Sequence, residues 1–76
     1  MEKIRKILAE TFGIRESELT ESTEMTDIES WDSLTHMEMI ANLESELEIE
    51  FTSDEIMELT NVSKIEKIVG EKLSGN

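Results

Sequence analysis

Apolar side chains recur at intervals of three and four residues in four stretches of this chain, and this spacing restricts the chain to a helical fold. The first stretch predicts a helix from Glu2 to Phe12, which Gly13 ends. Helices are also predicted from about Ser53 to Leu59 and from about Lys64 to Leu73. The core faces of these three helices contain Ile4, Ile7, Leu8 and Phe12, then Phe51, Ile56, Met57 and Leu59, and finally Ile65, Ile68, Val69 and Leu73.

A longer helix is predicted between them, beginning at Asp32 or Ser33 and reaching about Glu48. Asp and Ser are both favoured N-caps, so the sequence leaves the first residue of this helix open. When its residues are projected at about 100° each, the apolar ones form two stripes. One stripe fits the core, with a half-buried, hydrogen-bonded histidine among its members, and the other is left for a different contact. The core stripe contains His36, Met39, Ile40, Leu43 and Leu47, and the second stripe contains Leu34, Met37 and Ala41.

Two capping-box patterns mark the starts of the last two helices: Thr52 with Glu55, and Ser63 with Glu66. The segment from Gly13 to Asp32 lacks helical spacing and is expected to be a long loop, anchored by Ile14, Leu19, Met25 and Ile28. Together these segments predict an all-α fold, a small four-helix bundle with a long first loop and a short third helix. We expect one domain over residues 1–73 and a disordered tail over residues 74–76.

Acidic residues outnumber basic ones by 19 to 7, which gives a net charge of -12. This charge argues against nucleic acid as a partner, because phosphate contacts come from Lys and Arg. No basic residue occurs between Glu16 and Ser63. Such a run is typical of a soluble surface, and here it also favours electrostatic steering toward partners with basic docking surfaces.

Size and composition argue against an independent enzyme and against a metal site. A chain of 76 residues has room for one thin core, whereas most ligand pockets span roughly 300 Å³ or more. The chain has no Cys, and the single His36 cannot form a histidine metal cluster. Neither the apolar run of a signal peptide nor the ~20 apolar residues of a membrane span occurs, so we expect a cytoplasmic protein without a membrane span.

Ser33 stands where the acidic loop passes into the second helix, within the tetrapeptide Trp31-Asp32-Ser33-Leu34. A serine hydroxyl at the first turn of a helix is an exposed nucleophile or attachment point on a rigid mount. A serine of this kind, surrounded by carboxylates in a very small helical protein, indicates a protein that is modified at the serine and then passed between enzymes. The simpler alternative is that Ser33 is only a helix cap, in which case its replacement by Ala costs about 0.5 to 2 kcal/mol.

The order of the helices, the long first loop and the motif Asp32-Ser33-Leu34 at the head of an acidic helix resemble the acyl carrier protein family, from Ile4 to Leu73. The resemblance implies a 4'-phosphopantetheine arm, transferred covalently to Ser33 from coenzyme A by a phosphopantetheinyl transferase. It implies that Asp32 helps to hold magnesium or orients the serine in the complex with the transferase. It also implies cargo held as a thioester, no catalytic residue in the chain, and a monomer that serves acyl- or aminoacyl-loading and acyl-transfer enzymes.

Two positions depart from the usual pattern of fatty-acid carriers, which have small residues such as Gly and Ala before Asp-Ser-Leu. Here these positions hold Ser30 and Trp31, and this version of the motif looks more like freestanding carriers of specialised pathways, such as polyketide or peptide pathways or the modification of sugars and polysaccharides. The indole is expected either to cover the edge of the core or to shape a surface that a partner contacts. The residues expected to contact partners are Trp31, Leu34, Met37, Glu38, Ala41 and Glu44.

Other classes of function fit the sequence less well. A hydrolase that used Ser33, Asp32 and His36 would need a Gly-x-Ser-x-Gly elbow or an oxyanion loop, and the sequence has neither. A calcium sensor would need the Asp-rich loop of an EF-hand, which is also missing. The main alternative is an acidic helical interaction module without a prosthetic group, which a test of phosphopantetheine loading separates from a carrier.

Overall fold

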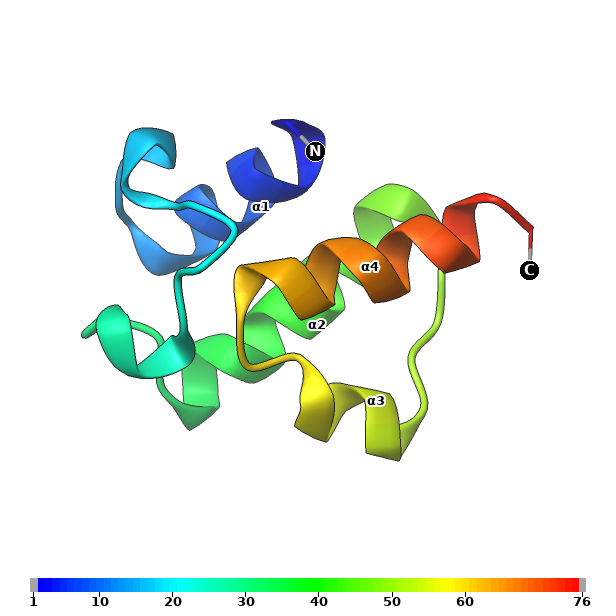
Figure 1. The fold of residues 1–76 in the computed structure, drawn as a ribbon. Coiled ribbons are helices and arrows are strands. Elements are labelled where there is room, and N and C mark those ends of the chain that lie inside the picture. Colours follow the sequence, from blue (N-terminus) through cyan, green and yellow to red (C-terminus); the bar gives the residue numbers. More distant parts are fainter. Residues whose placement is uncertain (1, 76) are drawn as a thin grey trace.

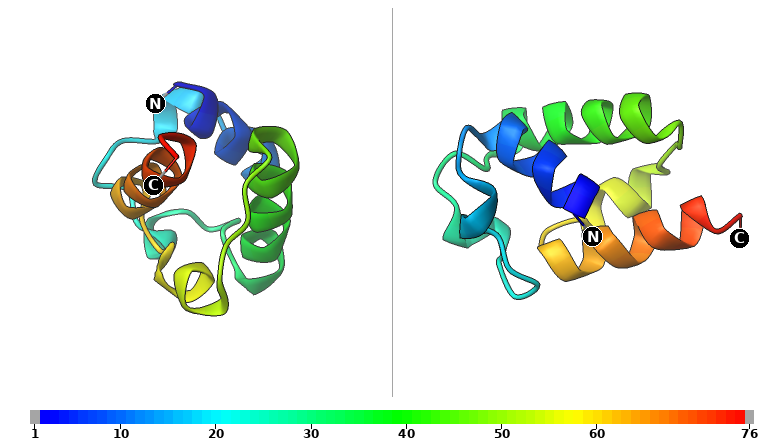
Figure 2. Two further views of the ribbon diagram at one scale, coloured as in Figure 1. Left: turned by 90° about the vertical axis from the view of Figure 1, so that its right-hand side faces the viewer. Right: turned by 90° about the horizontal axis from the view of Figure 1, so that it is seen from above.

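The computed structural model describes residues 2–75, which contain four α-helices and two short 3-10 helices. In Figure 1, α2 and α4 run in the same direction, with α1 lying obliquely above them and α3 below them. The end-on view in Figure 2 shows the four helices arranged around a common centre. The predicted all-α four-helix fold is therefore confirmed. The elements in chain order are α1 (Glu2–Phe12), η1 (Glu16–Glu18), η2 (Met25–Asp27), α2 (Ser33–Leu47), α3 (Ser53–Glu58) and α4 (Val62–Leu73).

The core forms where one face of each long helix meets the others, because each large apolar side chain gains about 1.5 to 3 kcal/mol when it is fully buried. The predicted core stripe of α2 agrees with the structure: His36, Met39, Ile40 and Leu43 are buried and Leu47 is half-buried. The largest fully buried side chains are Ile4, Leu8, Met39, Leu43, Leu59, Val62, Ile65 and Val69. The core therefore draws on α1, α2 and α4, and on the residue that follows α3.

The prediction of core burial is wrong for two residues: Met57 is 75% exposed and Leu73 is 50% exposed. Helix α3 has only 6 residues, and of these Ile56 packs against the core. Met57 follows Ile56 directly and so points about 100° away from it around the helix. Leu73 lies at the very end of α4, beyond the buried Val69.

The loop between α1 and α2 is long but well anchored. Leu19 is buried, and Ile14, Met25 and Ile28 are partly buried against the core, as predicted for the anchors of this loop. The loop also contains η1 and η2, two single turns that the helical spacing did not reveal. Its path is therefore set by apolar contacts spread along its whole length.

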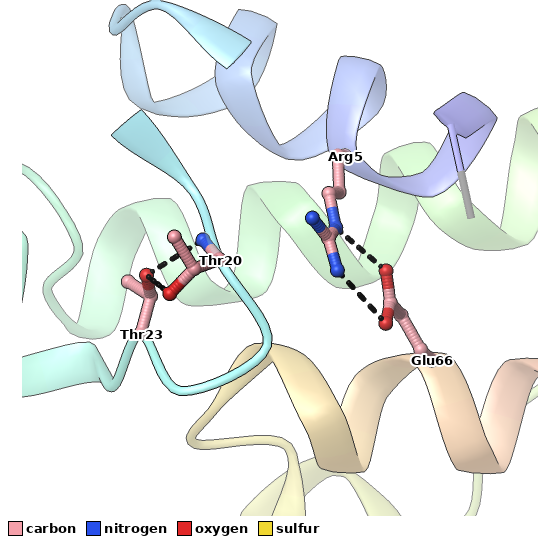
Figure 3. Close-up of polar contacts among 4 residues, drawn as sticks. All are labelled: Arg5, Thr20, Thr23 and Glu66. Carbon is pink, nitrogen blue, oxygen red and sulfur yellow. Dashed lines mark hydrogen bonds and ion pairs between the residues drawn. The ribbon is translucent and has the colours of Figure 1, made fainter. Parts of the chain in front are cut away.

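Hydrogen bonds join the middle of this loop to the start of α4. The hydroxyl of the buried Thr23 accepts a hydrogen bond from the backbone N–H of Thr20 at 2.9 Å, which closes a turn of the loop (Figure 3). Three backbone hydrogen bonds then cross to the segment around the start of α4: Met25 N to Thr60 O at 2.8 Å, Val62 N to Thr23 O at 3.0 Å and Ser63 N to Glu21 O at 3.2 Å.

An ion pair links α1 to α4. Arg5 Nε lies 2.8 Å from Glu66 Oε2 and Arg5 Nη2 lies 3.4 Å from Glu66 Oε1, so the guanidinium meets the carboxylate with two nitrogens (Figure 3). The hydrogen bond from Arg5 lowers the pKa of the Glu66 carboxyl below its ordinary value. This pair contributes to stability only while the carboxyl is ionised.

The cap of α3 is as predicted, whereas the cap of α4 is not. The Thr52 hydroxyl accepts from the backbone N–H of Glu55, and the Glu55 carboxylate accepts from the backbone N–H of Thr52. Helix α4 starts earlier than predicted, and its cap is Asn61, whose side-chain oxygen accepts from the backbone N–H of Lys64 at 2.8 Å. The predicted cap Ser63 is wrong because it already lies inside the helix.

The end of the chain continues the last turn of α4 as far as the structure describes it. Ser74, which was assigned to a disordered tail, donates from its backbone N–H to Gly70 O at 3.1 Å and from its hydroxyl to Glu71 O at 2.9 Å. Gly75 donates to Lys72 O at 3.3 Å, and Asn76 lies outside the described residues.

Candidate functional site

Ser33 is the first residue of α2 and is exposed, but it does not cap the helix. The cap is Asp32, whose Oδ1 accepts hydrogen bonds from the backbone N–H groups of Leu34 and Thr35, each at 3.0 Å. Among residues 2–75, no hydrogen bond engages the Ser33 hydroxyl. The choice of cap that the sequence left open is thus decided for Asp32, and the hydroxyl of Ser33 stays available for chemistry.

Thr35 completes the turn that carries Ser33. Its hydroxyl accepts from the backbone N–H of Asp32 at 2.9 Å and donates to Ser30 O at 2.6 Å. The hydrogen bond from the backbone N–H of Thr35 to the carboxylate lowers the pKa of Asp32 below its ordinary value. The sequence interpretation missed Thr35, although the pattern Asp-x-x-Thr has the spacing of a capping box, with Thr in place of the usual Glu.

Trp31 and His36, which flank Ser33 in the sequence, form a buried joint. The indole is 3% exposed and stacks on the ring of Phe12, with the ring centroids 4.8 Å apart. Its N–H donates to His36 Nδ1 at 3.0 Å, and the other ring nitrogen of His36 lies 2.8 Å from Ile56 O in α3. Because an indole nitrogen only donates, Nδ1 must accept, and the proton of the neutral ring is on Nε2.

This joint confirms one prediction and corrects another. His36 is hydrogen-bonded as expected, and it is buried rather than half-buried. Trp31, which was expected to contact partners, is instead buried: its side chain packs inside the protein and leaves almost no surface for another molecule. Of the two roles that were open for the indole, covering the edge of the core is the one that the structure supports.

An exposed apolar stripe runs along α2 from Ser33. Leu34 is 70% exposed and Met37 is 51% exposed, and Ala41 is exposed one turn further on. Glu38 is exposed beside them. Within the described part of the chain, two of the four exposed large hydrophobic side chains therefore lie within about one turn of Ser33.

Glu44 differs from the other residues expected to contact partners. It is half-buried, and its Oε2 accepts a hydrogen bond from the backbone N–H of Phe51 at 2.9 Å. One carboxylate oxygen is thus committed to the connection between α2 and α3. A change at Glu44 therefore disturbs the fold as well as any surface that a partner would meet.

Residues 2–75 show neither a metal site nor a membrane-crossing helix. That part of the chain has no group of three or more His, Asp or Glu side chains positioned to hold a metal ion. None of the helices described there has the length and apolar character that a membrane crossing requires.

Comparisons with known proteins identify the family of the chain. A family model described as "Phosphopantetheine attachment site" matches residues 2–69. The fold is similar to the solution NMR structure of holo acyl carrier protein from Geobacter metallireducens, with a TM-score of 0.86 and 35% sequence identity, over 95% of this chain and 83% of that chain. The chain therefore belongs to the phosphopantetheine-attachment family of acyl carrier proteins, which bind 4'-phosphopantetheine covalently and act as carriers rather than as catalysts.

Proposed function

We propose that Ser33 carries the 4'-phosphopantetheine arm and that the protein delivers acyl or aminoacyl groups, held on the arm as thioesters, between enzymes of a specialised biosynthetic pathway. The observation that carries this proposal is the exposed Ser33 hydroxyl at the first residue of α2, which no hydrogen bond within residues 2–75 occupies. Asp32 performs the capping that would otherwise engage this hydroxyl.

The residues around Ser33 fit a phosphodiester. The first N–H groups of a helix have no acceptor within the helix, and its dipole favours a negative group at this end by about 0.3 to 1 kcal/mol. Asp32 satisfies the N–H groups of Leu34 and Thr35, whereas no hydrogen bond within residues 2–75 engages the N–H of Ser33. Asp32 is a second negative charge, but its Oδ1 is turned toward the helix.

The reaction at this site is a phosphoryl transfer to oxygen. The Ser33 hydroxyl oxygen attacks the pyrophosphate of coenzyme A and forms a new O–P bond. The O–P bond to the adenosine 3',5'-bisphosphate breaks, and the serine proton passes to a base of the transferase. When bound, the arm supplies the thiol that forms the thioester with the cargo. The role of the chain is to present one oxygen atom and, afterwards, one docking surface.

We assign the docking surface to Leu34, Met37, Glu38 and Ala41. All four are exposed on α2 and lie within about 12 Å of Ser33 along the helix axis. An apolar stripe beside a carboxylate suits partners that combine a basic rim with an apolar contact. The assignment to a specialised pathway is supported by Ser30 and Trp31, which stand where fatty-acid carriers have small residues.

Loading tests the attachment site. The protein is incubated with coenzyme A, magnesium and a broad-specificity phosphopantetheinyl transferase, and its intact mass is measured. We expect the wild type to gain one phosphopantetheinyl group and Ser33→Ala to gain none. Ser45→Ala is the matched control, since Ser45 is another exposed serine of α2, and this variant should load like the wild type.

The stability of Ser33→Ala should differ from the expectation for a lost helix cap. Because Asp32 is the cap, the melting temperature should stay within a few degrees of the wild type, in the range of ordinary surface substitutions. A mass gain in Ser33→Ala would move the attachment to another residue. No gain in the wild type would favour the interaction module without a prosthetic group.

Charge reversal tests the docking surface. Glu38→Lys should lower kcat/KM for transfer of cargo to a cognate enzyme several-fold at low salt, because the on-rate depends on complementary charge. Glu46→Lys is the control, since Glu46 is also an exposed carboxylate of α2, lies about 12 Å further along the helix, and lines a hollow mainly with residues of α1. Equal rates for both variants would remove Glu38 from the surface.

A further inference from the structure

We propose that Thr35 is a positioning residue for the transfer of the phosphopantetheinyl group, an inference that rests on the proposed attachment at Ser33. Thr35 does not contact the reacting oxygen. It holds the backbone segment that leads into Ser33, and through this segment it sets the direction in which Ser33 is presented.

The hydroxyl of Thr35 is fully used in this role. A hydroxyl has one proton to donate, and the short 2.6 Å distance to Ser30 O identifies this carbonyl as its acceptor. The lone pairs of the same oxygen accept the backbone N–H of Asp32 at 2.9 Å. The Thr35 side chain thus joins the backbone of Ser30 to the backbone of Asp32, and it fixes the peptide that leads into Ser33.

The segment held by Thr35 is also tied to the rest of the fold. The Ser30 hydroxyl donates to Phe12 O, at the end of α1, at 2.7 Å. The Trp31 ring stacks on the Phe12 ring, and its N–H donates to His36. The hydroxyl of Thr35 therefore connects the first turn of α2 to the loop segment Ser30–Trp31, which is anchored on α1.

Thr35 also orients the carboxylate next to Ser33. Its backbone N–H donates to Asp32 Oδ1, while no hydrogen bond from residues 2–75 reaches Asp32 Oδ2. The carboxylate therefore turns one oxygen to the helix and keeps the other for solvent or for the transferase. Phosphoryl transfer needs an in-line approach, and a misplacement of about 1 Å in the reacting groups is enough to cost about 100-fold in rate.

The experiment compares three threonine variants in the loading reaction with coenzyme A, magnesium and the transferase. Thr35→Val keeps the shape of the side chain and removes the hydroxyl, and Thr35→Ser keeps the hydroxyl. Thr52→Val is the matched control, because the Thr52 hydroxyl caps α3 through the same kind of hydrogen bond, to the backbone N–H of Glu55 at 3.1 Å, without contacting the Ser33 turn. All rates are measured at a temperature where circular dichroism shows each variant folded.

We expect Thr35→Val to lower kcat for loading about tenfold or more, with KM for the carrier little changed, because Leu34, Met37 and Glu38 still form the docking surface. Thr35→Ser and Thr52→Val should load at nearly the wild-type rate. A second readout is the hydrogen exchange of the Asp32 amide, which should be faster in Thr35→Val and return to the wild-type rate in Thr35→Ser, since this amide donates to the Thr35 hydroxyl.

The outcomes separate this inference from the proposed function. If the wild type loads and Thr35→Val loads at the same rate, Thr35 has no positioning role. An equal loss of rate in Thr52→Val would show that reduced stability alone explains the effect, and a failure of Thr35→Ser to restore the rate would exclude the hydroxyl as the cause. If the wild type itself gains no mass, the proposed function fails and the inference falls with it.

Discussion

Trp31 and His36 together join helices α1, α2 and α3. The indole ring of Trp31 rests on Phe12 of α1, and its N–H reaches His36 of α2, which in turn donates to Ile56 O in α3. Each ring nitrogen of His36 has its own partner, so the side chain accepts one orientation and one tautomer. A polar joint buried in this way stabilises the fold only while all its partners are present.

Removing one partner of this joint should therefore lower the free energy of unfolding by more than the loss of one hydrogen bond, because the remaining buried polar groups are left unpaired. Trp31→Phe leaves His36 Nδ1 without a donor, and His36→Leu leaves both the indole N–H and Ile56 O unpaired, so each should lower the free energy of unfolding by about 1 to 3 kcal/mol. In the double variant the two losses should be non-additive, with a coupling of about 0.5 to 3 kcal/mol. Urea unfolding followed by circular dichroism measures all four proteins, and simple additivity would show that the bond is energetically unimportant.

Residue roles were predictable from the sequence where they depend on local chemistry. The donor and acceptor properties of a helix start were enough to restrict the cap to Asp32 or Ser33, and the structure shows Asp32. The role of Ser33 as the attachment residue stays a prediction. The sequence left open whether Trp31 covers the core or a partner surface, because its burial depends on Phe12, which lies far from it in the sequence. The hydrogen bond from the Phe51 N–H to the Glu44 carboxylate was not predictable either, because it depends on how the connection between α2 and α3 folds.

At the scale of the elements, helix ends that rest on local signals are predictable and those that rest on tertiary contacts are not. The bounds of α1 agree with the prediction, since Gly13 adopts a left-handed φ of 69° that ends the helix. The start of α4 does not agree, because the bridge between Glu24 and Asn61 holds Asn61 in an extended conformation. Asn61 thereby becomes the cap, and Ser63 becomes part of the first turn.

Two alanine substitutions distinguish these caps. Asn61→Ala should lower the free energy of unfolding by about 1 kcal/mol, because the backbone N–H of Lys64 loses its acceptor. Ser63→Ala should change it by less than about 0.5 kcal/mol, since Ser63 is exposed and its contact with Glu21 O is made by its backbone. Thermal unfolding of the two variants tests the assignment, and the reverse order would restore Ser63 as the cap.

The ion pair between α1 and α4 should give the protein a defined response to acid. Arg5 holds the pKa of Glu66 in the folded state below its ordinary value of 4.5, so the pair stabilises the fold above that pH and loses this contribution as the pH falls through the lowered pKa. Glu66→Gln should therefore be less stable than the wild type by about 0.5 to 1 kcal/mol at neutral pH.

The difference between Glu66→Gln and the wild type should shrink to near zero as the carboxyl becomes protonated. Chemical unfolding of both proteins at several values between about pH 7 and about pH 3 measures this difference directly. Because the comparison is between two proteins at the same pH, the general loss of charge repulsion in acid largely cancels. A gap that is constant with pH would mean that Glu66 acts through packing rather than through its charge.

At the scale of the whole molecule, repulsion between carboxylates opposes the compact state. The net charge is -12, and the extents of the molecule are 32 × 23 × 20 Å. Ion pairs such as Arg5 with Glu66 and Lys72 with Glu55 offset a small part of this charge. At low ionic strength the Debye length of about 30 Å spans the protein, so most of its charges act on one another.

Salt should therefore stabilise the protein. An increase of NaCl from about 0.01 M to about 1 M shortens the Debye length to about 3 Å and should raise the melting temperature. A variant with Glu38→Gln and Glu46→Gln together carries less charge, and its melting temperature should start higher and rise less. A decrease with salt in the wild type would show that the ion pairs outweigh the net repulsion.

The single tryptophan gives this protein a built-in optical reporter. The chain has no tyrosine, so its near-ultraviolet emission comes almost wholly from an indole in a defined, dry setting, two residues before Ser33. A change in that emission on addition of coenzyme A and a transferase would follow events at the head of α2 in real time, with no attached dye. The same signal would show whether the ring stays in place while the carrier is in use.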